Sequence, residues 1–233
     1  MKLFYEPEIL QKFSLNEEES RHCKKVLRLK EGDIIYITDG KGSLFKSEIL
    51  EISEKKTYVN ILETKNNFEK RPYNLHIAIA PTKNIERIEW FVEKTTEIGI
   101  DKISFLLCEN SERKLIKTER LNKIIEAAMK QSYKTYHPLV SEMIKFEDFI
   151  KNNSSQQKFI AHCEDSNKEY LANLIQKKSD YIILIGPEGD FSTKEIALAL
   201  EYNFLAISLS NSRLRTETAA IVACDIISII NNL

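Results

Sequence analysis

Two apolar runs near the C-terminal end of the chain, each followed by a loop and a helix-like segment, decide the fold. The first is YIILI (residues 181–185), which leads into GPEGDFSTKE (186–195). The second is FLAIS (204–208), which leads into LSNSRLRTETAA (209–220). Short apolar runs bounded by turn signals are typical of buried strands, and a helix after each strand predicts parallel pairing. Because open α/β sheets bind ligands where strands end in loops, we expect both loops to form one site.

The placement of glycine supports this expectation. The chain has only six glycines, and Gly186 and Gly189 both fall in the first loop. Glycine loses much conformational freedom on folding, and this cost is justified where the backbone, which has no Cβ there, must approach a ligand closely. Ser192 followed by Glu195 predicts a capped start for the next helix.

Residues 73–233 continue the alternation of strand-like and helix-like segments, which predicts an α/β fold with a mostly parallel sheet covered on both faces. The stretch of residues 85–98 is helix-periodic, and Gly99 ends it. The last stretch, residues 217–233, is apolar on more than one stripe, which indicates core or a subunit interface. The other expected strands are LHIAIA (75–80), KISFLLC (102–108) and KFIAHC (158–163), and the other expected helices cover residues 119–134, residues 146–150 and a stretch before YIILI.

The first 70 residues have a different pattern, which predicts a small β-rich domain (residues 1–70) ahead of the α/β domain (73–233). Asn16 followed by Glu19 predicts a capping box for a helix that runs to about Leu27. Three segments with alternating apolar residues follow, with an Asp-Gly turn between the first two, as in antiparallel hairpins. The polar stretch KNNFEKRP (65–72) marks the domain boundary.

The composition argues against a membrane protein, a disulfide framework and a metal site. Hydrophobic residues make up 42% of the chain, yet no apolar run approaches the roughly 20 residues that span a bilayer. The N-terminal residues MKLFYEPEIL lack a secretory signal, so we expect a cytoplasmic protein. The four histidines are scattered and the four cysteines form no CxxC pair, so we expect no metal. Cys108 and Cys163 lie in apolar runs and are expected to be buried thiols.

Net charge is −1, but basic residues gather in two places. Residues 21–30 contain five basic residues and no acid, and residues 113–134 contain seven basic residues against Glu119 and Glu126. Such stretches are either solvated helix faces or patches that neutralise phosphates, and the sequence leaves both open.

Common catalytic motifs are absent, which narrows the candidate chemistry. GxGxxG, typical of dinucleotide sites, and the nucleophile elbow GxSxG do not occur. What remains is the glycine loop with Glu188 and the second loop with Arg213, Arg215, Thr216 and Glu217. Taken singly, GPEG reads equally as a tight turn, and Arg215 with Glu217 as a surface ion pair. Two such loops on successive strands favour a shared site.

The paired loops resemble the signature of the 16S rRNA (uracil-N-3)-methyltransferase family, in the SPOUT superfamily. The resemblance covers almost the whole chain in order: HCKKVLR (22–28), IERIEWFVEKTTEIGI (85–100), SERK (111–114), EAAMKQS (126–132), GPEGDFSTKE and SRLRTETAAIVA. The arginine-rich loop with TETA is its most specific part. Three residues depart from the family pattern, since Asp190 and Ser210 replace glycines and Lys134 replaces an arginine.

The resemblance implies a PUA-like β-barrel domain for RNA, a SPOUT domain with a C-terminal trefoil knot, and a homodimer. It implies S-adenosyl-L-methionine as cofactor and 16S rRNA of the 30S subunit as substrate. Arg215 is expected to stabilise negative charge on the uracil oxygens, with Glu217 as base or as orienter of an arginine. The implied cofactor-binding residues are Ile185, Gly186, Glu188, Gly189, Leu209, Ser210, Asn211 and Leu214. The expected RNA contacts are His22, Arg28, Arg113, Gln131 and Lys134, although His22 reads equally as a capped surface histidine.

The implied reaction transfers a methyl group to the imide nitrogen at position 3 of a uridine. That nitrogen is hidden in a base pair, so the target uridine must be single-stranded or extruded. Two other readings are an RNA-binding protein that has kept the fold without the reaction, and a SPOUT methyltransferase for another RNA position.

Overall fold

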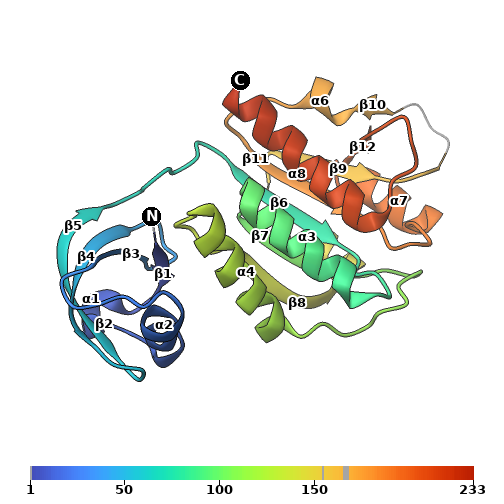
Figure 1. The fold of residues 1–233 in the computed structure, drawn as a ribbon. Coiled ribbons are helices and arrows are strands. Elements are labelled where there is room, and N and C mark those ends of the chain that lie inside the picture. The colour runs from blue at the N-terminus through green and yellow to red at the C-terminus, as the bar shows by residue number, and fades with distance from the viewer. Residues whose placement is uncertain (1, 154, 165–167) are drawn as a thin grey trace. The chain divides into compact units, whose positions relative to one another are not determined.

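The computed structural model describes residues 2–153, 155–164 and 168–233 (Figure 1). It divides into two compact units. Unit 1 comprises Met1–Lys70 and Glu126–His137, and unit 2 comprises Arg71–Ile125 and Pro138–Leu233. Each unit has its own buried core.

A seven-stranded sheet forms the middle of unit 2. Its strands follow the order β10-β12-β9-β11-β6-β7-β8, and every neighbouring pair is parallel. The α/β fold class with a parallel sheet is therefore confirmed. The strand bounds are β6 Asn74–Ile79, β7 Lys102–Leu107, β8 Leu139–Lys145, β9 Gln157–Ala161, β10 Glu169–Tyr170, β11 Asp180–Ile185 and β12 Leu205–Ser208.

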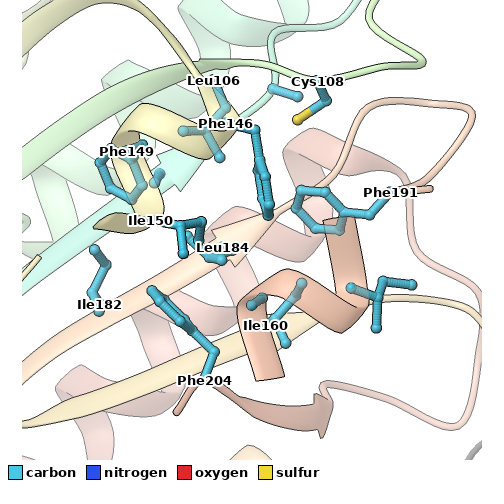
Figure 2. Packing of buried hydrophobic residues seen from close by; sticks show 14 residues of the cluster. Leu106, Cys108, Phe146, Phe149, Ile150, Ile160, Ile182, Leu184, Phe191 and Phe204 are labelled. Carbon is cyan, nitrogen blue, oxygen red and sulfur yellow. The ribbon is translucent and has the colours of Figure 1, made fainter. Parts of the chain in front are cut away.

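The central strands are apolar throughout because helices cover both faces of the sheet. In β11, Ile182 and Leu184 belong to a core cluster together with residues of α5 (Phe146–Lys151) and α7 (Thr193–Glu201). Figure 2 shows Phe146, Phe149 and Phe204 in this layer. Along a strand successive side chains alternate in direction, so Tyr181, Ile183 and Ile185 face the opposite layer. There α8 (Thr216–Asn232) packs on β6, β11 and α3 (Ile85–Ile98) (Figure 1).

The helix ends follow the local signals in the sequence. Gly99 ends α3 with a positive φ of 121°, a conformation that favours glycine. At the start of α7 the Ser192 side chain accepts from the Glu195 N–H, and the Glu195 carboxylate accepts from the Ser192 N–H. That capping box is confirmed. The expected helix 119–134 is α4 (Thr118–Ser132), and the expected helix before β11 is the short α6 (Leu171–Leu174).

Unit 1 contains a five-stranded sheet in the order β1-β3-β4-β5-β2, curled into a nearly closed barrel (Figure 1). The expected hairpins are present, since β3, β4 and β5 pair antiparallel. Phe4, Leu15, Ile37 and Phe45 lie in its core. The bounds are β1 Leu3–Tyr5, α1 Ile9–Lys12, β2 Ser14–Leu15, β3 Ile34–Thr38, β4 Leu44–Ile52 and β5 Thr57–Lys65.

The helix after Asn16 differs from expectation in two ways. Asn16 does accept from the Glu19 N–H at 3.0 Å, but the Glu19 carboxylate pairs with Lys130 at 2.6 Å, so the expected capping box is wrong. The α-helix α2 (Glu17–Arg21) is short, and a π-helix follows from His22 to Val26. π-turns of this kind occur frequently at functional sites.

Residues that follow α4 complete unit 1. The Thr38 hydroxyl donates to the Thr135 carbonyl at 3.2 Å, and the Gly42 N–H donates to the same carbonyl at 2.9 Å. Gly42 has a φ of 98°, and a Cβ there would overlap the ring of Tyr136. Gly42 is therefore required both by its backbone conformation and by the close approach of Tyr136.

The sequence-based expectations missed two strands at the edges of the unit 2 sheet, β8 and β10. The trefoil knot implied by the resemblance stays a prediction. No helix in the described part of the chain is long and apolar enough to cross a bilayer.

Candidate functional site

Two adjoining cavities open at the carboxyl ends of β9, β11 and β12. They have volumes of about 480 Å³ and about 380 Å³, within the range typical of small-molecule sites. They share five lining residues, namely Ala161, Cys163, Arg213, Leu214 and Ala219. The loops after β11 and β12 thus meet at one place, together with a third loop that follows β9.

The larger cavity, which we call the β12-loop cavity, is lined mainly by residues 207–214. Four of the expected cofactor-binding residues line it, namely Leu209, Ser210, Asn211 and Leu214. Asn211 accepts a hydrogen bond from the Tyr170 hydroxyl. Its lining mixes apolar side chains with small polar ones, a composition typical of ligand pockets.

We call the smaller cavity the β11-loop cavity. It is lined by the remaining expected cofactor-binding and catalytic residues, with two exceptions. Ile185, Gly186, Glu188 and Arg215 line it. Gly189 and Glu217 line neither cavity.

Gly186 lies between the β11-loop cavity, which it lines, and the core residue Phe191. A Cβ at this position would lie 3.1 Å from the Phe191 ring and 3.2 Å from the Asp190 carboxylate. Phe191 is buried and packs on Phe146 with ring centroids 5.3 Å apart (Figure 2). A larger residue at position 186 would therefore push against the core or fill the cavity.

Ser210 fits its loop without the conformational freedom of glycine. It is not among the described residues with positive φ. Its hydroxyl accepts from the Ser212 N–H at 3.1 Å, and its carbonyl accepts from the Ser208 hydroxyl at 3.1 Å. Serine hydroxyls often stabilise turns in this way. This departure from the family pattern thus stabilises the loop locally.

Glu188 and Arg113 brace the loop that follows β6. The Glu188 carboxylate accepts from the Lys83 N–H at 3.1 Å. Arg113 Nε donates to the Thr82 carbonyl at 3.0 Å, and a second guanidinium nitrogen donates to the Lys83 carbonyl. Two donors of Arg113, expected to contact RNA, are therefore already used inside unit 2.

Three arginines line the β11-loop cavity: Arg87 from α3, and Arg213 and Arg215 from the loop before α8. Glu217, on the first turn of α8, is only 5% exposed, and its Oε1 lies 3.8 Å from Arg87 Nε. Its other oxygen, Oε2, has no hydrogen-bond partner among the described residues. Arg87 was not predicted from the sequence, because its position in a helix-periodic stretch does not distinguish it from an arginine that faces solvent.

The loop after β9 was also missed, although the same rule about strand ends applies to it. Cys163 is exposed and lines both cavities, so the expectation of a buried thiol is wrong there, whereas Cys108 is buried as expected. β9 ends at Ala161. Cys163 lies beyond the strand, so the alternation of buried and exposed side chains along a strand does not apply to it. Burial, and then the charge of Lys168, lowers the pKa of the neighbouring His162.

Four of the expected RNA contacts lie in unit 1: His22, Arg28, Gln131 and Lys134. His22 is exposed on the π-helix, and its ring forms a T-shaped pair with the ring of Phe4, with centroids 6.3 Å apart. Arg28 is exposed and has a φ of 53°, rare outside glycine. Gln131 is exposed and Lys134 is half-buried.

The two basic stretches are partly neutralised within the protein. Arg21 pairs with Glu17 at 2.6 Å and Lys25 pairs with Glu54 at 2.8 Å. In the second stretch Arg120 pairs with Glu89, as Lys130 does with Glu19. No ion pair engages Arg28 or Lys134 in the part of the chain that the structure describes, which leaves them available to an anionic ligand.

The arrangement suits a ligand with one apolar part and one part that develops negative charge. Apolar and small polar side chains, with Lys168 and Arg213, line the β12-loop cavity. All three arginines line the β11-loop cavity. Fixed cationic donors in a partly enclosed site stabilise anionic transition states. Within the described residues no group of three or more His, Cys, Asp and Glu side chains is placed to hold a metal ion.

Comparison with protein families gives two matches. Residues 69–228 match a family described as an RNA methyltransferase domain. Residues 15–62 match a family described as an RNA methyltransferase PUA domain. The second match covers most of the barrel of unit 1.

Individual relatives agree with the family matches. The chain is 30% identical over 207 residues to ribosomal RNA small subunit methyltransferase E of Rickettsia conorii, covering 87% of this chain and 83% of the relative. A crystal structure of a probable rRNA-methyltransferase from Porphyromonas gingivalis has 40% identity and a TM-score of 0.95, covering 100% of this chain and 99% of that one. Ribosomal RNA small subunit methyltransferase E from Neisseria gonorrhoeae, bound to S-adenosyl methionine, has 26% identity and a TM-score of 0.84, covering 96% and 95%.

Proposed function

The chain belongs to the ribosomal RNA small subunit methyltransferase E family, and we propose that it methylates the N3 atom of a uridine in 16S rRNA with S-adenosyl-L-methionine as methyl donor. The observation that carries this proposal is the cluster of Arg87, Arg213 and Arg215 in the β11-loop cavity, beside a second cavity of small-molecule size. We place the reaction in the cytoplasm, on RNA of the 30S subunit.

The residues present fit the cofactor. Gly186 lines the β11-loop cavity, and a Cβ at this position would crowd the side chains of Phe191 and Asp190 at 3.1 and 3.2 Å. We assign the cofactor cradle to the residues expected from the sequence that line the cavities: Ile185, Gly186, Glu188, Leu209, Ser210, Asn211 and Leu214. Gly189 lines neither cavity, and we propose that it holds the loop after β11 in place, because the Gly189 carbonyl accepts a hydrogen bond from Asn110 Nδ2 at 3.3 Å. The related Neisseria gonorrhoeae enzyme was crystallised with this cofactor.

S-adenosylmethionine supplies an electrophilic methyl group on a sulfonium. The protein must supply the rest: a uridine held with N3 in line, and a means to remove the N3 proton. Nearby positive charge favours the anionic form of an acid, which lowers its pKa. We propose that Arg215, with Arg87, binds the uracil oxygens and lowers the pKa of N3, so that the proton passes to water. Alignment of the reacting atoms contributes further, up to about 7–11 kcal/mol in favourable cases.

Glu217 is proposed to act through Arg87 rather than as the base. It lines neither cavity, and the nearest cation to its carboxylate is Arg87. We expect Glu217→Gln to keep methyl transfer within about ten-fold of wild type, because glutamine still offers an oxygen to Arg87. Glu217→Ala should lose more, and it should lose it in kcat rather than in cofactor affinity. Steady-state kinetics from pH 6 to 10 check this. Loss of about 10²-fold or more in Glu217→Gln, with loss of the pH dependence, would instead identify Glu217 as the base.

RNA binding is proposed to use basic residues of unit 1, among them the exposed Arg28 and the half-buried Lys134. If about four phosphates are contacted, affinity for 16S rRNA fragments should fall roughly 50-fold between 50 and 200 mM salt. Arg28→Gln and Lys134→Gln should each reduce the slope of log Kobs against log salt by about 0.7. Lys177→Gln, at an exposed site in unit 2, is the matched control and should leave the slope unchanged. A flat salt response would contradict phosphate binding.

A homodimer is proposed through the outer side of α8. Ile229 on α8 is 50% exposed and Trp90 on the neighbouring α3 is 46% exposed, and apolar side chains at subunit interfaces are commonly exposed in the isolated chain. Light scattering should give about twice the monomer mass. Charged substitutions at Trp90 and Ile229 should return the protein to a monomer.

Calorimetry with S-adenosylmethionine separates the proposed enzyme from an RNA-binding protein that has lost the reaction. We expect saturable one-site heat for the purified protein and methyl transfer to 30S particles from labelled cofactor. RNA binding without any heat of cofactor binding would contradict the proposal.

A further inference from the structure

We infer that Asp190 is a positioning residue that fixes the loop after β9 against the loop after β11 and so preforms the cofactor cavity. The inference rests on the proposed function, because it names S-adenosylmethionine as the ligand whose affinity Asp190 controls. Asp190 lines the β11-loop cavity.

The backbone of Asp190 has the conformation that glycine adopts most easily. Its φ is 63°, and its N–H donates to the Pro187 carbonyl at 2.9 Å to close a tight turn. Aspartate and asparagine tolerate this left-handed region better than other non-glycine residues, although less well than glycine. The turn itself therefore favours glycine over aspartate at this position.

What aspartate adds is a carboxylate with both oxygens in use. Oδ2 accepts from the Cys163 N–H at 2.6 Å, and Oδ1 accepts from the Phe191 N–H at 2.8 Å. Hydrogen bonds to an ionised acceptor are shorter and stronger than neutral ones. The first of these bonds joins residues 27 positions apart in the chain, so it links two loops rather than closing a local turn.

The residue that Asp190 holds is part of the cavity wall. Cys163 lines both cavities, and Ala161, two residues earlier, does so as well. A third loop joins the same arrangement, since Asn110 Nδ2 donates to the Asp190 carbonyl at 3.1 Å. Loops after β7, β9 and β11 thus meet at Asp190.

The consequence for binding follows from the fixed position of the Cys163 backbone. When a wall of a site is already fixed in the free protein, the ligand does not have to order it, and affinity is higher. When the wall is fixed in only a fraction of molecules, the apparent Kd rises by the inverse of that fraction. Without the carboxylate, the Cys163 N–H has no acceptor at position 190, and the loop loses its tether to β11.

Two substitutions at one position separate the tether from the turn. Asp190→Gly keeps the turn and removes the tether. We expect it to raise the calorimetric Kd and the KM for S-adenosylmethionine about ten-fold with kcat unchanged, the size of effect that loss of one charge-assisted hydrogen bond produces. Asp190→Asn keeps an oxygen for Cys163 and should stay within about three-fold of wild type. Asp148→Asn, at an exposed acid on α5, controls for loss of charge elsewhere.

NMR spectroscopy can detect the hydrogen bond between the Cys163 N–H and the Asp190 carboxylate directly. Selective ¹⁵N-cysteine labelling gives four amide signals because the chain has four cysteines, and Cys163→Ser identifies the relevant one. The Cys163 amide proton should lie downfield in wild type, move upfield in Asp190→Gly and stay near its place in Asp190→Asn.

Two results would overturn the inference. One is an unchanged Kd and an unchanged Cys163 signal in Asp190→Gly. The other is an Asp190→Asn protein that binds as weakly as Asp190→Gly, because the charge would then act on the ligand itself. If wild type fails to bind S-adenosylmethionine, the proposed function fails, whereas the amide signals still report on the tether.

Discussion

Replacement of Arg215 by alanine is expected to lower the rate of methyl transfer about 10²–10³-fold, the loss typical when one preorganised donor to a developing anion is removed. Arg215 is exposed at the N-cap position of α8, where its side chain makes no capping hydrogen bond, and it lines the β11-loop cavity. Because its guanidinium makes no capping hydrogen bond in the part of the chain that the structure describes, we expect Arg215→Ala to keep the fold. Affinity for S-adenosylmethionine should stay within about three-fold of wild type, so the loss should appear in kcat.

The Arg215→Ala variant is also expected to change how the rate of methyl transfer depends on pH. A positive charge beside the uracil lowers the pKa of N3, and removal of Arg215 raises it again. The rate of Arg215→Ala should therefore keep rising with pH after the wild-type rate has levelled, and the difference between the two proteins should shrink as the pH increases. Arg215→Lys, which keeps the charge without the planar fork, should fall between them. Full activity at pH 7 in Arg215→Ala, or a constant ratio at every pH, would contradict the role assigned to this residue.

Replacement of Phe191 by alanine is expected to lower the free energy of unfolding by about 3–5 kcal/mol, the usual loss for a buried phenylalanine. Phe191 is 3% exposed, packs on Phe146 and lies against Gly186 (Figure 2). Because the residue before it is Asp190, the cavity left behind should also loosen the cofactor loop. We expect weaker S-adenosylmethionine binding in addition to the lower stability measured by urea unfolding.

Phe204→Ala is the matched control for this prediction. Phe204 belongs to the same core cluster and is 1% exposed. It lies just before β12, and none of its atoms is among the three nearest to a Cβ at Gly186. Its loss should lower stability by a similar amount with a smaller effect on cofactor affinity. Equal effects of the two variants on affinity would show that cofactor binding depends on overall stability alone.

Much of unit 2 could be predicted from the sequence because local signals and burial agree there. β11 is apolar on both faces, and the Ser192–Glu195 capping box needs only residues three positions apart. The edge strand β8 was missed because its residues are exposed or half-exposed, with no fully buried position, which blurs the apolar pattern of a strand. The Asn16 capping box failed for a different reason. The Glu19 carboxylate pairs with Lys130, 111 residues away, and no local pattern shows such a partner.

The site was predicted in part for similar reasons. Residues of the two loops after β11 and β12 could be found because each loop follows a recognisable strand. Arg87 and Cys163 reach the same cavity from α3 and from the end of β9, and only the fold brings them there. Asp190 stood out in the sequence as a departure from glycine, but its acceptor role toward Cys163 depends on the pairing of β9 with β11.

The most direct test of the proposed reaction is to map the methylated nucleotide. 30S particles from cells that lack this enzyme would be incubated with the purified protein and S-adenosylmethionine, and the 16S rRNA digested and sequenced by mass spectrometry. We predict one added methyl group, on N3 of a single uridine, and its absence with Arg215→Ala. A methyl group on a ribose hydroxyl or on another base, or no methylation by a protein that binds both cofactor and RNA, would contradict the proposal.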